Sequence, residues 1–216
     1  MKPKLFFLSG LGADKRAFDA LTLHFKNEIV HIEWLVPIKQ ESFSQYAKRI
    51  IDRYQIASSD VLVGLSFGGL MAVEIHHIIN NDSVILISSA SCRKELHPFF
   101  RVTSRLGLTR LIPKRKLNQP NHFIYKGFAI KTASHKQLLD TIIKDSDTDF
   151  VQWAIRQMGN WNRKNRIEGI IKIHGDNDLM IPIHNAEKDY TIKGGGHFMV
   201  VDRAEEVSEI LNNISI

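Results

Sequence analysis

The sequence predicts an α/β protein in which short buried strands alternate with helices. Three observations carry this prediction: short apolar runs recur along the chain, helical stretches separate most of them, and several runs end in glycine-containing turns. The 216 residues fit one domain with a small insertion, and a hydrophobic content of 44% is enough for a packed core. No apolar run approaches the ~20 residues of a membrane-spanning helix.

The N-terminal elements follow this alternation. Residues 4–8 are predicted as a strand, 17–24 as a helix, and 29–35 as a second strand that Pro37 ends. A helix follows with an apolar stripe at helical spacing, formed by Phe43, Tyr46, Ala47, Ile50, Ile51 and Tyr54. Ser42 and Gln45 have the spacing of a capping box at the start of this helix.

The remaining core elements continue the pattern. A third strand, a helix and a fourth strand are expected at 61–65, 70–79 and 84–88, and two further strands at 169–174 and 190–193. A final helix presents one apolar face, formed by Ala204, Val207, Leu211 and Ile214. Asp202 and Glu205 are expected to cap its start.

Residues 93–166 break the alternation between the fourth and fifth strands. Three prolines interrupt the segment, and its later part has helical apolar spacing. Because long loops without secondary structure are uncommon in compact domains, we expect a helical cap at 93–166. Residues 1–92 and 167–216 would then form the core.

Positive charge gathers at the start of this insertion. The net charge is +6, and residues 93–116 contain eight cationic side chains and one acid: Arg93, Lys94, Arg101, Arg105, Arg110, Lys114, Arg115, Lys116 and Glu95. A solvated face, a contact for an anionic substrate and docking on an anionic membrane surface remain open, with the membrane not favoured. No nucleic-acid-binding motif accompanies the charge, so no nucleic-acid partner is expected.

The single cysteine, Cys92, excludes an internal disulfide and favours a reducing, cytoplasmic location. The first residues loosely imitate a secretory signal. However, Gly10 and Gly12 interrupt the apolar stretch, and charged residues follow immediately. We therefore expect this stretch to remain part of the fold.

The segment Gly64-Leu65-Ser66-Phe67-Gly68 joins the third strand to the following helix. This is a G-x-S-x-G pattern in the strand–turn–helix setting of a nucleophile elbow, where the tight turn requires small residues around the serine. The alternative is an ordinary glycine-rich turn. Average glycine usage gives roughly 0.1 chance occurrences of the pattern in a chain of this length.

A nucleophilic serine requires a base, and the base requires an acid that orients it. The fifth strand is followed by a segment that contains Asp176 and Asp178, and the sixth by Gly194-Gly195-Gly196-His197. Both segments follow the carboxyl ends of predicted parallel strands, where open α/β sheets place their sites.

These motifs, with Ser9-Gly10-Leu11-Gly12 after the first strand, resemble the α/β-hydrolase superfamily, in particular its lid-bearing esterases and lipases. The resemblance implies Ser66 as nucleophile, His197 as base and Asp178, rather than Asp176, as acid. It further implies an oxyanion hole formed by the backbone N–H groups of Leu11 and Phe67. The supporting glycines would be Gly10, Gly12, Gly64 and Gly68.

The chain departs from the family in two places. Ser9-Gly10 stands where the family often has His-Gly, which affects the tuning of the oxyanion loop. The chain also begins at what would be the family's third strand. We therefore expect a shortened, all-parallel sheet of six strands in the order 2-1-3-4-5-6.

The resemblance implies a serine hydrolase that cleaves a carboxylic ester of a small or medium acyl group. Two alternatives remain: a thioesterase or acyltransferase acting on an anionic acyl carrier, and a non-hydrolytic small-molecule binding protein. Met180, Phe198 and Met199 adjoin the expected site and are candidates for an apolar substrate wall or for ordinary core. The other histidines, including His174, are expected to be structural or exposed. No cofactor or metal is implied, the expected partner is a small acyl substrate, and the oligomeric state is left open.

Overall fold

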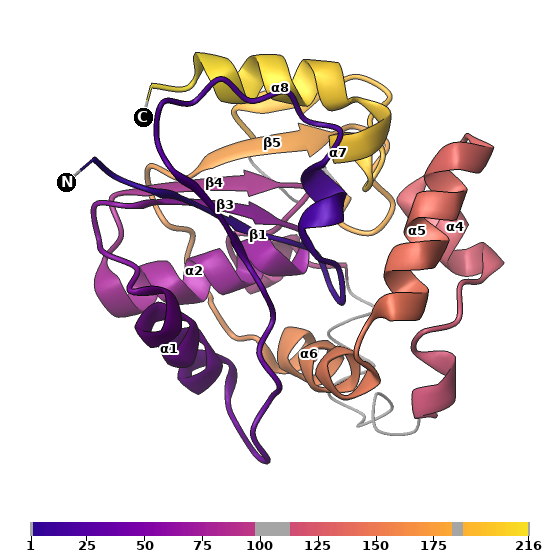
Figure 1. Cartoon of the computed structure of the whole chain (residues 1–216), viewed down its shortest axis with the longest axis horizontal. Coiled ribbons are helices and arrows are strands. Elements are labelled where there is room, and N and C mark those ends of the chain that lie inside the picture. Colours follow the sequence, from indigo (N-terminus) through magenta and orange to yellow (C-terminus); the bar gives the residue numbers. More distant parts are fainter. Residues whose placement is uncertain (1, 98–112, 183–187, 216) are drawn as a thin grey trace.

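A parallel sheet forms the centre of the fold (Figure 1). It has six strands in the order β2-β1-β3-β4-β5-β6. The computed structural model describes residues 2–97, 113–182 and 188–215. The predicted all-parallel sheet and its order are confirmed, with ends that shift by a few residues. The strands are β1 (Leu5–Leu8), β2 (Ile29–Ile32), β3 (Val61–Leu65), β4 (Ser83–Ile87), β5 (Ile171–Gly175) and β6 (Tyr190–Ile192).

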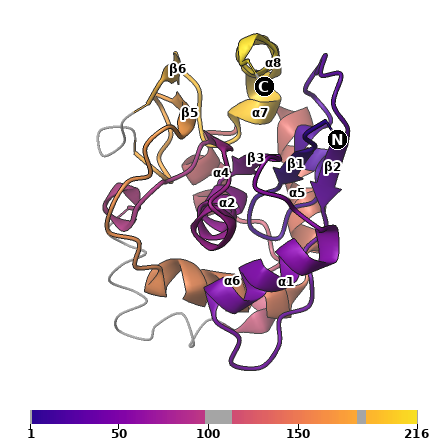
Figure 2. The same ribbon diagram turned by 90° about the vertical axis from the view of Figure 1, so that its left-hand side faces the viewer.

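Helices cover both faces of this sheet (Figure 2). Because side chains alternate along a strand, Phe6 and Leu8 of β1 join the core on one face, whereas Leu5 and Phe7 join the core on the other. The first face is covered by α1 (Phe43–Tyr54), α2 (Phe67–Ile79) and α6 (Thr148–Asn160), and the second by α7 (Met199–Asp202) and α8 (Ala204–Asn213).

The capping box of α1 is present as predicted. The Ser42 hydroxyl accepts a hydrogen bond from the Gln45 backbone N–H at 3.2 Å, and the Gln45 side chain accepts one from the Ser42 N–H at 2.9 Å. Two otherwise unpaired N–H groups of the first turn are thereby satisfied.

The predicted helix at 17–24 is wrong. The chain forms only a 3₁₀ turn, η1 (Lys15–Phe18), and then leaves helical conformation. Side chains of α8 bind the backbone of this segment instead: the Thr22 N–H, which a helix would have used, donates to the Ser208 hydroxyl at 3.0 Å, and the Thr22 carbonyl accepts from the Asn212 amide at 2.9 Å. Tertiary contacts therefore decide the local structure of this segment.

The predicted capping pair of the last helix, Asp202 and Glu205, is also wrong. The helical conformation breaks at Arg203 (φ −131°, ψ 34°), which separates α7 from α8, and no side chain among the described residues caps α8. Asp202 instead ends α7. The apolar face is retained because Val207 and Leu211 pack into the core.

The insertion contains η4 (Lys114–Lys116), α4 (His122–Phe128), α5 (Ala133–Asp145) and α6. Helices α4 and α5 lie beyond the carboxyl ends of the strands (Figure 1). Of the basic stretch, residues 98–112 lie outside the described residues, whereas the three cations of η4 are exposed, and Lys114 forms an ion pair with Asp149. None of the helices in the described part of the chain is both long and apolar enough to cross a membrane.

Candidate active site

Ser66 stands in the sharp turn between β3 and α2. Its φ of 52° and ψ of −117° are unusual for a residue with a side chain, as is expected at a strained elbow. The flanking glycines explain how the turn closes: a Cβ at Gly64 would lie 2.4 Å from the Gly69 Cα, and one at Gly68 would lie 2.1 Å from the Leu8 carbonyl oxygen. Glycine therefore occupies the two positions where a side chain would collide with the backbone of a neighbouring segment.

The Gly68→Ala variant should be strongly destabilised. The Leu8 and Ser9 carbonyl oxygens would lie 2.1 and 2.4 Å from the new Cβ, and the end of β1 must move to accept it. We expect the free energy of unfolding to fall by about 3 kcal/mol, as measured by urea denaturation. Gly10→Ala is the control, because the nearest atom to its Cβ is the Ser66 Cβ at an ordinary 3.8 Å. Equal denaturation midpoints for the two variants would contradict this account.

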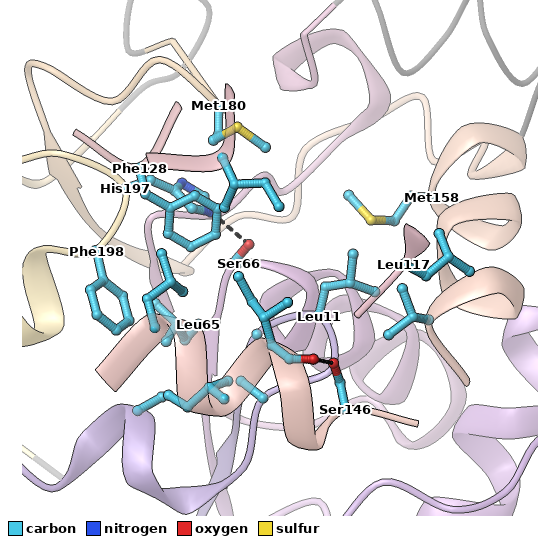
Figure 3. Close-up of a pocket in the computed structure, with 18 residues that line it drawn as sticks. Leu11, Leu65, Ser66, Leu117, Phe128, Ser146, Met158, Met180, His197 and Phe198 are labelled. Atoms are coloured by element: carbon cyan, nitrogen blue, oxygen red, sulfur yellow. Dashed lines mark hydrogen bonds between the residues drawn. The ribbon is translucent and has the colours of Figure 1, made fainter. Parts of the chain in front are cut away.

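Ser66 begins a continuous chain of hydrogen bonds. Its Oγ lies 2.8 Å from Nε2 of His197, and Nδ1 of His197 lies 2.8 Å from Oδ2 of Asp178 (Figure 3 shows the first of these contacts). A carboxylate only accepts hydrogen bonds, so Nδ1 carries the imidazole proton. Nε2 is then free to accept the proton of the serine hydroxyl.

Asp178 is held as an anion in the turn after β5. It is buried, and its Oδ1 accepts hydrogen bonds from the backbone N–H groups of Met180 and Ile181, each at 2.9 Å. Burial alone would raise the pKa of Asp178, but the charge of His197 and the hydrogen bonds from His174 and His197 outweigh it and hold the pKa well below its usual range.

The rival carboxylate lies elsewhere. Asp176 is exposed, and its Oδ1 accepts a hydrogen bond from the Gly194 N–H at 2.5 Å. The structure thus brings Asp178, not Asp176, beside His197.

The loop after β1 lies beside Ser66, since a Cβ at Gly10 would be in van der Waals contact with the Ser66 Cβ. The Ser9 hydroxyl donates to the Ala13 carbonyl at 2.6 Å, the Trp34 indole donates to the Gly10 carbonyl at 3.3 Å, and Gly12 has a φ of 65° that favours glycine. Neither the Leu11 N–H nor the Phe67 N–H donates a hydrogen bond to any residue that the structure describes. The oxyanion hole formed by these two N–H groups stays a prediction.

An apolar cavity of about 200 Å³ opens at Ser66 (Figure 3). Met180 and Phe198 line it as expected, whereas Met199 is completely buried in the core between sheet and helices and does not. The half of the wall that the insertion supplies was not predicted from the sequence, because its packing leaves no local motif. These residues are Leu117, Ile124, Phe128, Leu139, Ile142, Ile143, Ser146, Val151 and Met158.

Helix α4 packs directly onto the His197 loop. The Phe128 and His197 rings meet edge to face with centroids 5.0 Å apart, and a Cβ at Gly196 would lie 2.6 Å from the Ala129 Cβ. The insertion therefore forms one wall of the site and shields the imidazole. Residues 2–97, 113–182 and 188–215 contain no cluster of three or more His, Cys, Asp or Glu side chains that could bind a metal ion.

Similar folds occur among solved structures. The enol-lactonase from Burkholderia xenovorans LB400 matches with a TM-score of 0.75 and 15% identity, covering 98% of this chain and 90% of that one. The esterase from Exiguobacterium antarcticum matches with a TM-score of 0.68 and 15% identity, over 97% of this chain and 90% of that one. For an alpha/beta hydrolase fold protein from Burkholderia ambifaria the TM-score is 0.66 and the identity 12%, over 99% and 91% of the two chains.

Comparisons of sequence alone find no counterpart: no model of a known family matches, and no curated protein does. The fold assignment rests on the structural likeness, which spans nearly the whole chain, and on the parallel sheet with helices on both faces. The chain therefore has the α/β-hydrolase fold.

Proposed function

We propose that this protein is a serine hydrolase that cleaves a carboxylic ester through an acyl-enzyme on Ser66. One observation carries the proposal: the Ser66–His197–Asp178 hydrogen-bond chain, with 2.8 Å at each step, ends inside an apolar cavity. A nucleophile, a base in the required tautomer and a buried orienting anion are the parts that acyl transfer needs.

In the proposed reaction, the Ser66 oxygen attacks the ester carbonyl while His197 Nε2 takes the hydroxyl proton. The N–H groups of Leu11 and Phe67 stabilise the negative charge that develops on the carbonyl oxygen, and the start of α2 adds favourable amide dipoles. The intermediate expels the alcohol, which leaves with the proton from His197. Water then attacks the acyl-enzyme by the same steps, releasing the acid and restoring Ser66.

The wall of the cavity indicates the substrate class. Its described lining is almost entirely aliphatic or aromatic and includes no lysine or arginine, which favours an uncharged acyl group of small or medium size over a carrier recognised by its phosphate. We further propose that residues 93–166 act as a cap, because α4 and α5 supply side chains to this wall. Two of the proteins with similar folds are named as an esterase and an enol-lactonase, which agrees with an ester substrate.

The test combines turnover with labelling. We expect hydrolysis of nitrophenyl acyl esters to peak at one chain length in a series from two to twelve carbons. A fluorophosphonate should label the peptide that contains Ser66, as mapped by mass spectrometry. A folded protein that hydrolyses none of these esters and takes up no label would contradict the proposal and favour the binding-protein alternative.

A further inference from the structure

A second histidine lies beside the candidate acid. His174 is on β5, four residues before Asp178, and its side chain is completely buried. Its Nε2 lies 2.8 Å from the Ile181 carbonyl oxygen and 3.4 Å from Asp178 Oδ2. Both oxygens are acceptors, so Nε2 carries a proton and directs it toward the pair.

The other ring nitrogen of His174 has no comparable contact. Nδ1 is buried and has no hydrogen-bond partner among the described residues. A proton there would be an unsatisfied donor in the protein interior, which costs free energy. His174 therefore serves as a neutral donor through Nε2. The only polar contacts of its ring among the described residues are made by that nitrogen.

The His174 N–H adds a third hydrogen bond to the two that already stabilise the turn 178–181. Asp178 Oδ1 accepts from the N–H groups of Met180 and Ile181, while His174 holds the Ile181 carbonyl. Both backbone groups of Ile181 are thereby fixed, and rotation of the carboxylate is restricted. Asp178 Oδ2 is left to face His197.

We propose that His174 is a positioning residue for the proposed ester hydrolysis: it fixes the turn that carries Asp178 and shares the negative charge of Oδ2 with His197. The expected loss of activity rests on the proposed function. The expected effect on the charge at Asp178 rests on the geometry alone.

The direction in which the pH dependence of activity shifts when His174 is replaced follows from the charges around Asp178. The titratable side chains that lie against Asp178 in the described structure are His174 from β5 and His197 from the loop after β6, and α4 presents the uncharged Phe128 to His197. Without the His174 donor, the carboxylate charge is compensated less and stabilises the His197 imidazolium more. His197 then keeps its proton, and the enzyme stays inactive, up to a higher pH.

The experiment compares His174→Leu, which removes the donor, with His174→Gln, whose terminal amide can replace Nε2–H. For the leucine variant we expect kcat to fall about tenfold with little change in KM. The acidic limb of the kcat/KM profile should move up by about half a pH unit. The glutamine variant should recover most of both. An acidic limb that stays in place or moves to lower pH, or a glutamine variant no better than leucine, would overturn the proposal.

Two additions keep the outcome unambiguous. If the leucine variant does not fold, His174→Asn replaces it, because its amide is one methylene too short to reach Ile181, and the same contrast with glutamine is expected. Titration of the His197 ring by NMR needs no substrate, and its midpoint should shift upward in the donor-less variant. If no ester is hydrolysed, the proposed function fails while this titration still decides the role of His174.

Discussion

Replacing Ser66 with alanine should lower kcat/KM for any ester that the protein hydrolyses by about 10⁴-fold or more. The Oγ atom is the group that forms the proposed acyl bond, and it lies 2.8 Å from His197 Nε2. Removal of one oxygen from a half-buried turn should leave the fold intact, so the thermal unfolding midpoint should stay close to that of the native protein. Initial rates and calorimetry on the same preparation measure both quantities.

Ser44→Ala is the matched control, since Ser44 is an exposed serine on α1. It should retain native activity and native fluorophosphonate labelling, whereas Ser66→Ala should take up no label. Residual hydrolysis by Ser66→Ala within about tenfold of the native rate would show that another nucleophile, or a directly activated water, does the chemistry.

Replacing Asp178 with asparagine should lower kcat by about 10³- to 10⁴-fold. The asparagine oxygen can still accept the Met180 and Ile181 N–H groups, so the turn is preserved. Its amide group, however, would face His197 Nδ1 and force the imidazole proton onto Nε2. The base would then be unable to accept the Ser66 proton.

Asp176→Asn is the matched control for this change, two residues away and exposed. Within the described residues its carboxylate accepts one side-chain hydrogen bond, from the Gly194 N–H in the loop that leads to His197, so we expect kcat to change by less than about threefold. If Asp176→Asn lost more activity than Asp178→Asn, the assignment of the acid would be wrong.

The candidate triad could be predicted because each member lies in a short motif at the end of a strand. Parallel strands bring their carboxyl ends to one edge of the sheet, so Ser66, Asp178 and His197 meet although 131 residues separate the first from the last. Each candidate residue can therefore be found from its local motif, and the parallel sheet brings the three residues together.

Elements that depend on tertiary packing were not predictable in the same way. Leu21, Leu23 and Phe25 are partly buried at every second position, a spacing that fits an extended segment and that the predicted helix at 17–24 overlooked. Met199 is adjacent in sequence to Phe198, which lines the cavity, yet it faces the core. The insertion gave helical spacing, but no local signal says which of its apolar residues reach Ser66.

Helix α6 has a double role that limits how this protein can change. Val151 and Met158 line the cavity. Between them, Trp153 lies with its ring centroid 4.4 Å from that of Tyr46, in the core shared with α1. Substitutions on α6 that reshape the cavity therefore act on the same packed layer that holds the sheet and its helices together. Selection for a new substrate through Val151 or Met158 of α6 would trade specificity against folding stability, whereas Ile143 of α5, which lines the cavity and is only partly buried, offers a route with a smaller trade-off.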